Sequence, residues 1–322
     1  RDDYDALAGA LAAGHIIECG CQATGGNYSF FKEVLSFDNV GYPIAEIKKD
    51  GSFYITKHPG TGGLVSIGTV TAQLLYEISA PAYLNPDVIA HFDTLKIEEV
   101  SKDRVYVSGC RGSSPTNTHK VCINLAGGYR NGMEFILTGL DIEEKAQIIT
   151  DALFNSIGGK EQFDEVSILL DRTDKTNPDS NEEAMASLRI SVKSKDPDLV
   201  GRMFTAKMVE LALANYPGLY MGGAVRSGGP VLVYWPALID SKHINETVHI
   251  DGKEINVMPT NQLDLEETYY QKQPVEIPPP PSGETLNKPL GELFGARSGD
   301  KGGCANIGVW AKSENAFSFL NN

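Results

Sequence analysis

Two ionisable side chains on separate segments are of the types that acid/base catalysis needs. Glu18 lies in the segment "HIIEC", directly before a glycine-rich turn, and His58 opens a second glycine-rich segment, "HPGTGG". We expect "HIIEC" to be a short buried strand, where removal from water would suit the Glu18 carboxyl to general acid or base catalysis. The catalytic candidates are therefore Glu18 and His58. The alternative is that Glu18 only marks the end of a surface strand.

The segment at residues 58–78 predicts a buried helix with a glycine-rich entrance, because its apolar residues recur at intervals of three and four. The first turn of a helix presents unpaired N–H groups, and glycines let an anion approach them closely. We therefore predict that Gly60, Gly62 and Gly63 line a substrate pocket. The N–H groups of residues 62–65 would face a carboxylate or phosphate supplied by a ligand or by a neighbouring side chain. A tight turn packed against a sheet is the alternative.

Three arginines stand beside small residues in short turns and are candidate substrate-binding groups. They are Arg111 in "SGCRGSSP", Arg226 in "AVRSGGP" and Arg297 in "ARSGDKGG". A guanidinium binds a carboxylate or phosphate through two parallel hydrogen bonds. We expect Arg111 or Arg226 at the rim of the predicted pocket, and Arg297 in a flexible loop that projects from its sheet. Purely steric turns are the alternative.

The five cysteines form an odd set with no C-x-x-C spacing: Cys19, Cys21, Cys110, Cys122 and Cys304. This usage predicts reduced thiols and a cytoplasmic location. We expect no bridge between Cys19 and Cys21. Cys110 would be a thiolate nucleophile if Arg111 faced it, and an unreactive buried thiol otherwise. No metal-ligand spacing appears, and the sequence indicates no particular cofactor.

The charge of the chain limits its partners. The 322 residues carry a formal net charge of −14. Nucleic acids and anionic membranes bind basic surfaces, so neither is an expected partner. No apolar run approaches the roughly 20 residues that cross a bilayer. The expected partner is a small anionic molecule, and a homo-oligomer is left open.

The elements that would position these side chains indicate a mixed α/β (α+β) fold. Residues 1–14 predict a helix, and two alternating runs that meet at Asp50-Gly51 predict a hairpin. From residue 129 the order is β-α-β-β-α-β, with helices capped by Asp141 and Asp196, which is typical of a ferredoxin-like unit. We expect residues 133–224 to form a four-stranded antiparallel sheet with both helices on one face.

The predicted domain organisation has four parts. An α/β part covers residues 1–128, and the ferredoxin-like unit with additional strands covers 129–270. A proline-rich linker covers 271–287, because consecutive prolines favour extended geometry. Residues 288–322 begin a second, truncated ferredoxin-like domain. The abrupt start and end predict a fragment of a longer chain.

Four stretches together resemble one known family: "ECGCQATGG", "HPGTGGLVSIGTVTAQLLYEI", "DRVYVSGCRGSSP" and "ARSGDKGGCANIGVWA". They are similar to the acyclic terpene utilisation (AtuA) family, over about residues 15–310. The resemblance implies the later part of the family's first domain plus the start of its C-terminal domain. It also implies a role in degrading acyclic isoprenoids, such as citronellol and geraniol, as acyl-coenzyme A thioesters. It assigns no catalytic residue, and Cys21 and Cys304 replace the family's usual alanine and aspartate.

Two functions are consistent with these features. The first is an enzyme that acts on an acyl thioester or branched acid through Glu18 and His58. The second is a non-catalytic binding or assembly subunit of an acyl-coenzyme A-processing complex. Convergence of Glu18, His58, Arg111 and Arg226 on one pocket would favour the enzyme, and their dispersal would favour the second function.

Overall fold

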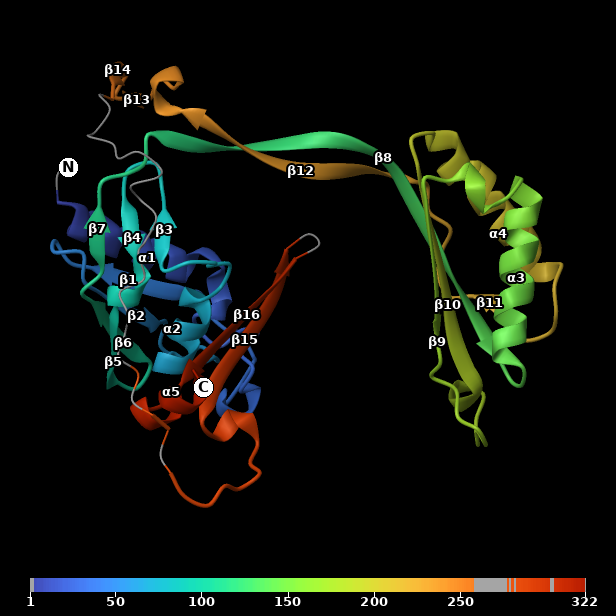
Figure 1. Cartoon of the computed structure of the whole chain (residues 1–322), viewed down its shortest axis with the longest axis horizontal. Coiled ribbons are helices and arrows are strands. Elements are labelled where there is room, and N and C mark those ends of the chain that lie inside the picture. Colours follow the sequence, from blue (N-terminus) through green and yellow to red (C-terminus); the bar gives the residue numbers. More distant parts are fainter. Residues whose placement is uncertain (1–2, 258–276, 278, 281, 302–303, 322) are drawn as a thin grey trace. The chain divides into compact units, whose positions relative to one another are not determined.

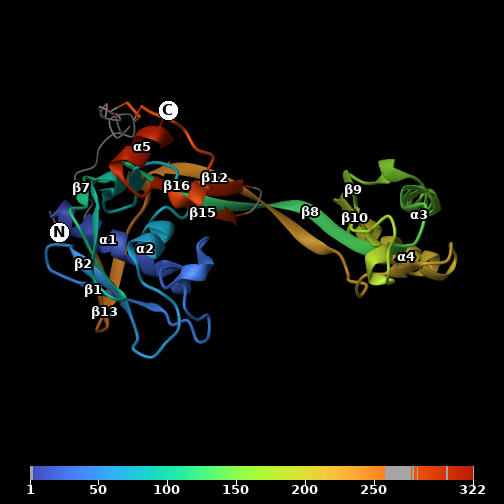
Figure 2. The same cartoon turned by 90° about the horizontal axis from the view of Figure 1, so that it is seen from below.

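The chain divides into two compact units. The computed structural model describes residues 3–257, 277, 279–280, 282–301 and 304–321. The first unit comprises Arg1–His119 and Leu238–Asn322, and the second comprises Lys120–Ala237 (Figure 1, Figure 2). Both combine helices with antiparallel sheets, which confirms the predicted mixed α/β class. The predicted domain boundaries stay predictions, and most of the first half of the predicted linker lies outside the described residues.

The predicted hairpin at Asp50-Gly51 begins a four-stranded antiparallel sheet in the first unit. The order is β1-β2-β6-β5. Gly51 adopts a φ of +80°, which only glycine adopts readily, so it allows the turn. Phe53, Ile55, Val105 and Val107 point to one face and are fully buried. The strands are β1 (Pro43–Ile47), β2 (Phe53–Lys57), β5 (Lys96–Ser101) and β6 (Arg104–Ser108).

The first helix packs on that buried face and is longer than predicted. α1 runs from Tyr4 to Glu18, and Asp3 caps its start by accepting a hydrogen bond from the Ala6 N–H. The expected strand at residues 15–19 is therefore wrong. Ala8, Ala12 and Ile16 lie four residues apart and are fully buried, so the apolar segment continues the helical stripe instead of starting a strand.

The second helix is shorter than predicted. α2 spans Ile67–Leu74, whereas the pattern predicted a helix toward residue 78. A capping box holds its start, because the Ser66 side chain accepts from the Thr69 N–H and the Thr69 side chain accepts from the Ser66 N–H. Glu77 has a φ of +62°, a left-handed conformation that cannot continue the helix.

Smaller elements complete the first unit. Arg297 does not lie in a projecting loop, as was expected, but within β15, which pairs with β16 along its whole length. A three-stranded sheet has the order β3-β4-β7. These elements are β3 (Ala82–Leu84), β4 (Ile89–His91), β7 (Arg111–Ser113), β13 (Thr247–Ile250), β14 (Lys253–Asn256), β15 (Phe294–Lys301), β16 (Cys304–Ala311) and α5 (Glu314–Leu320).

The second unit has the predicted β-α-β-β-α-β order of elements. Its antiparallel sheet has the order β11-β8-β10-β9, and β12 also pairs with β8. Phe135 and Leu188 of the sheet share one core with Ile149 of α3 and Phe204 of α4, which confirms that both helices cover the same face (Figure 1). The elements are β8 (Thr118–Thr138), α3 (Ile142–Ile157), β9 (Glu165–Asp171), β10 (Met185–Ser194), α4 (Phe204–Leu213), β11 (Leu219–Met221) and β12 (Gly229–Asp240).

The two predicted helix caps of the second unit differ from expectation. Asp141 occupies the N-cap position, but its side chain makes no capping hydrogen bond. Asp196 is not a cap: its carboxylate accepts from the Asp198 N–H, and a π-helical turn at Leu199–Met203 separates it from α4. Within the described parts of both units, no helix is both long and apolar enough to cross a membrane.

A pair of glycines on α1 gives a stability test. A Cβ at Gly9 would overlap the backbone of Gly51, whereas a Cβ at Gly14 of the same helix would have nothing within 4 Å. We expect Gly9→Ala to lower the free energy of unfolding by about 1–3 kcal/mol through overpacking. Gly14→Ala should raise it by about 0.5–1 kcal/mol through better helix propensity. Hydrogen exchange of the α1 amides measures both, and equal effects at the two positions would contradict the packing.

Candidate functional site

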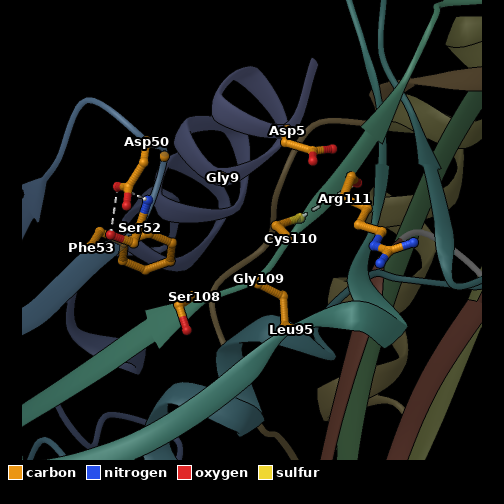
Figure 3. A pocket seen from close by; sticks show the side chains of 11 residues that line it. Asp5, Gly9, Asp50, Ser52, Phe53, Leu95, Ser108, Gly109, Cys110 and Arg111 are labelled. Carbon is orange, nitrogen blue, oxygen red and sulfur yellow. Dashed lines mark hydrogen bonds between the residues drawn. The ribbon is translucent and has the colours of Figure 1, made fainter. Parts of the chain in front are cut away.

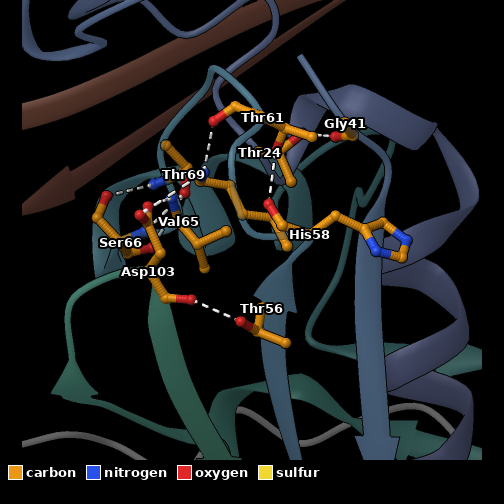
Figure 4. Close-up of polar contacts among 10 residues, drawn as sticks. Thr24, Gly41, Thr56, His58, Thr61, Val65, Ser66, Thr69 and Asp103 are labelled. Atoms are coloured by element: carbon orange, nitrogen blue, oxygen red, sulfur yellow. Dashed lines mark hydrogen bonds and ion pairs between the residues drawn. The ribbon is translucent and has the colours of Figure 1, made fainter. Parts of the chain in front are cut away.

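The N–H groups at the entrance of α2 are bound by groups of the chain itself (Figure 4). The Gly63 N–H donates to the Ser36 carbonyl oxygen over 2.8 Å, and the Leu64 N–H donates to that of Thr24 over 2.8 Å. The Val65 N–H donates over 3.0 Å to the Asp103 carboxylate. Of these three N–H groups only that of Val65 faces a carboxylate, which a neighbouring side chain supplies, and the other two face backbone carbonyl oxygens.

The glycines of this loop are needed for close backbone approach. A Cβ at Gly62 would overlap the backbone of Asp38, and one at Gly63 would overlap that of Thr24. Gly60 adopts a φ of +77° and has open space around it. Close packing against the backbone is therefore enough to explain the glycines at positions 62 and 63. Ligand binding by Gly60, Gly62 and Gly63 stays a prediction.

Glu18 is not removed from water as was expected, and the second catalytic candidate is exposed as well. Glu18 ends α1, and its side chain is 58% exposed, 3.7 Å from Nδ1 of the buried His15. His58 follows β2 and is also exposed. Neither side chain lines any of the three cavities described below. The catalytic assignment of Glu18 and His58 therefore stays a prediction without support from burial.

Arg111 lines a cavity of about 230 Å³ in the first unit, together with Asp5 and Cys110 (Figure 3). Its guanidinium points away from the Cys110 sulfur. Burial, together with the nearby Asp5 and Asp93, raises the pKa of the Cys110 thiol to about 12. The thiol is therefore protonated at neutral pH, which supports the unreactive alternative.

Arg226 lines a different cavity, of about 370 Å³, in the second unit. Arg189, Glu134 and Ser191 also line it, and the Arg226 side chain is exposed. The cavities of Arg111 and Arg226 share no lining residue. Neither cavity is lined by residues 58–65, so the place of Arg111 or Arg226 at the rim of the α2 entrance stays a prediction.

Arg297 is the candidate at which separate glycine-rich segments meet. It is 4% exposed, and its guanidinium carbon lies 4.0 Å from the centre of the Tyr76 ring. Its terminal nitrogens donate to the side-chain oxygens of Gln22 and Asn306, each over 3.3 Å. Burial lowers the pKa of Arg297. Within the described residues no carboxylate forms an ion pair within 4.0 Å of this guanidinium, and Glu77 is near enough to favour its charged form.

An apolar cavity of about 640 Å³ adjoins this cluster. Leu75 belongs to its wall, and both Leu75 and the Arg297 side chain come within 3.3 Å of the position that a Cβ of Gly308 would occupy. The cavity thus lies beside the aliphatic part of Arg297. Its lining residues are Thr71, Leu75, Ile277, Val309, Trp310, Ala311, Ser313, Glu314, Phe317 and Leu320.

Sequence analysis identified Arg297 but missed its partners and the cavity. Gln22, Tyr76 and Asn306 all lie inside the glycine-rich stretches, where they were treated as parts of turns or of the helix. Polar residues two positions from a glycine, as Gln22 and Asn306 are, or just after a helix, as Tyr76 is, were the available signal. The five cysteines are free, and no metal-sized cluster of acidic, histidine and cysteine side chains occurs within the described ranges.

The buried His15 lies next to the last residue of α2, and it gives a test of how stability depends on pH. His15 is 5% exposed, its Nε2 lies 3.1 Å from the Leu74 carbonyl oxygen, and burial lowers the pKa of its imidazole. In the unfolded chain His15 therefore takes up a proton as the pH falls through about 6.5, whereas in the folded chain it does so only at a lower pH. We expect stability to fall as pH drops below about 6.5, and His15→Gln to flatten this slope.

The control for that test is His58→Asn. His58 is exposed in the folded chain, so its removal should leave the pH dependence of the unfolding midpoint unchanged. An unchanged slope in His15→Gln would contradict the role of His15.

Asp103 gives a second test at the α2 entrance. Its φ is +53°, and its carboxylate accepts a hydrogen bond from the Val65 N–H. Lys57 Nζ lies 3.7 Å from Oδ2 of the same carboxylate. Asn keeps both the acceptor and the tolerance of this backbone conformation, whereas Ala loses both. We expect Asp103→Ala to cost about 2–3 kcal/mol in urea unfolding and Asp103→Asn less than about 1 kcal/mol. Equal costs would show that charge, and not the hydrogen bond, is what matters.

Comparison with known proteins identifies the family. A family model described as "Acyclic terpene utilisation family protein AtuA" matches residues 1–250 of the 322. No curated protein and no solved structure matches the chain. The match includes the whole second unit and the segments that contain Gln22 and Tyr76, and it ends before β15. The chain therefore belongs to the acyclic terpene utilisation (AtuA) family.

Proposed function

We propose that the chain takes part in acyclic terpene utilisation by binding an acyclic isoprenoid acid or its acyl-coenzyme A thioester. The apolar cavity beside Arg297 carries this proposal. Its volume of about 640 Å³ is within the range of small-molecule sites, and most of its wall is apolar. A branched hydrocarbon chain would bury its surface against Leu75, Trp310 and Phe317.

The acidic end of such a ligand would interact with Arg297. The guanidinium is buried, and burial lowers its pKa although Glu77 lies near enough to oppose that shift; a ligand carboxylate would further favour the charged form. Gln22 and Asn306 hold the guanidinium through long hydrogen bonds of 3.3 Å, which a charged acceptor would replace or join. Glu314 on the cavity wall would repel an anion, so the acidic end should lie away from α5.

Binding without chemistry is the function that these positions favour. Glu18 and His58 are exposed, and neither lines the cavity of Arg111 in the same unit. This separation supports a binding or assembly subunit of an acyl-coenzyme A-processing complex over an acid/base enzyme. The enzyme is the second candidate, because the family context concerns degradation.

Two phenylalanines of α5 provide a matched test. Phe317 lines the cavity and is 42% exposed, whereas Phe319 does not line it and is 46% exposed. The probes are the acid obtained by oxidising citronellol, its coenzyme A thioester, and coenzyme A alone, followed by calorimetry and fluorescence. We expect Phe317→Ala to weaken binding of the acid about tenfold or more, since a buried Phe contributes about 1.5–3 kcal/mol. Phe319→Ala should stay within about threefold of the unsubstituted chain.

The outcomes separate the two functions. Absence of binding to both acid and thioester at millimolar concentration would contradict the proposal. Turnover of the thioester that is lost in Glu18→Gln and His58→Asn would establish the enzyme instead. Equal weakening by Phe317→Ala and Phe319→Ala would place the ligand outside this cavity.

A further inference from the structure

The cavity of about 370 Å³ in the second unit is bounded on one side by the segment that follows β11. β11 pairs with β8 as far as Met221, and the Gly222 N–H still donates to the Glu134 carbonyl oxygen over 2.8 Å. Residues 222–228 belong to no strand, and residues 222–224 and 226 of this segment line the cavity. A volume of this size is within the range of small-molecule sites.

Arg226 is held beside β8 by a buried asparagine. Asn131 is 7% exposed, and its Nδ2 donates to the carbonyl oxygens of Arg226 over 3.0 Å and of Val200 over 2.8 Å. Its Oδ1 accepts from the Gly132 N–H over 2.9 Å. A buried amide with hydrogen bonds at both its oxygen and its nitrogen is fixed in position. The backbone of Arg226 is therefore fixed at the level of Asn131, and its side chain lines the same cavity as Glu134.

The base of the cavity is the face of the sheet opposite the core. Odd-numbered residues of β8 and even-numbered residues of β10 point into the core, and side chains alternate along each strand. Glu134, Arg189 and Ser191 therefore point to the other face, and all three line the cavity. The register sets Glu134 opposite Arg189, and Ser191 opposite Gly132. Both a carboxylate and a guanidinium thus reach the cavity from the sheet.

Two opposite charges in this cavity have no partner of opposite sign within the described part of the chain. Neither the Glu134 carboxylate nor the Arg226 guanidinium forms an ion pair within 4.0 Å there. Glu134 only accepts a hydrogen bond from the Ser187 hydroxyl. Arg189 differs, because its Nη2 lies 3.6 Å from the Asp171 carboxylate. Glu134 and Arg226 are therefore the charges that a ligand would neutralise.

We propose that this cavity binds a small zwitterion, with its ammonium group at Glu134 and its carboxylate at Arg226. A ligand that was only an anion would be repelled by Glu134, and a ligand that was only a cation would be repelled by Arg226. A guanidinium binds a carboxylate through two parallel hydrogen bonds, and the Ser191 hydroxyl is a further donor in the same wall. This site shares no lining residue with the apolar cavity of the first unit, and it does not depend on the function proposed there.

The spacing of the two charges selects a ligand with several methylene groups between its ends. Glu134 and Asn131, which fixes Arg226, are three residues apart on β8, or about 10 Å along a strand. In an α-amino acid both charged groups are attached to the same carbon and cannot span such a distance. In 5-aminopentanoate a chain of methylene groups separates the ammonium from the carboxylate, which makes it the suitable probe.

The test follows the backbone amide signals of Gly222 and Gly223 in the full chain by NMR, so that binding elsewhere is not counted. The probes are 5-aminopentanoate, pentanoate and pentylamine at constant ionic strength. We expect 5-aminopentanoate to bind about tenfold or more tightly than either analogue, because each analogue lacks one of the two ion pairs.

Three substitutions that each remove one charge complete the test. Arg226→Gln and Glu134→Gln act in the cavity, and the second keeps an acceptor for the Ser187 hydroxyl. Arg202→Gln is the control, because Arg202 is an exposed arginine of the same unit that does not line the cavity. We expect R226Q and E134Q each to raise the Kd of 5-aminopentanoate about tenfold or more, and R202Q to change it by less than about threefold.

Circular dichroism of each variant ensures that folded chains are compared. Unmoved Gly222 and Gly223 signals at millimolar concentrations of 5-aminopentanoate would overturn the proposal. Equal affinity for pentanoate would show a simple anion site, and an equal loss of affinity in R202Q would show a general charge effect. Either result also overturns it.

Discussion

Backbone-to-backbone contact at glycine is the constraint on which the first unit depends. A Cβ at Gly9 would overlap Gly51, one at Gly63 would overlap Thr24, and one at Gly112 of β7 would overlap Tyr4 of α1. In each case the obstacle is backbone, which cannot move aside as a flexible side chain can. Glycine is therefore required where helix, turn and sheet approach one another. The same contacts use the loop N–H groups, so side chains must supply any further anion binding.

Arg297 also holds separate segments of the first unit together, but it does so through a buried charged side chain. Its stacking on Tyr76 ties β15 to the end of α2, and its bond to Gln22 ties β15 to the turn after α1. Burying a guanidinium is costly unless its donors are satisfied, and Gln22 and Asn306 each accept one hydrogen bond from it over 3.3 Å. The buried cation therefore holds β15 against two segments that are distant in the sequence.

Local patterns were predictable and long-range contacts were not. The hairpin at Asp50-Gly51 and the β-α-β-β-α-β order depend on neighbouring residues, so turn chemistry and periodicity sufficed. The end of α1 failed because "HIIEC" is a short apolar run, which periodicity alone cannot assign to helix or strand. Arg297 looked like part of a loop because its neighbours are small, but pairing with β16 makes it a strand residue.

The position of Arg297 in the chain has a consequence for biosynthesis. Its partner Gln22 is 275 residues away, and the first unit is interrupted by the whole second unit. During synthesis the second unit can fold as one continuous stretch, whereas the hairpin of β15 and β16 reaches α2 only after the segment up to residue 311 has been made. Until then Leu75 and Tyr76 lack their cover. The nascent chain must therefore keep this apolar surface from aggregating while the second unit is synthesised.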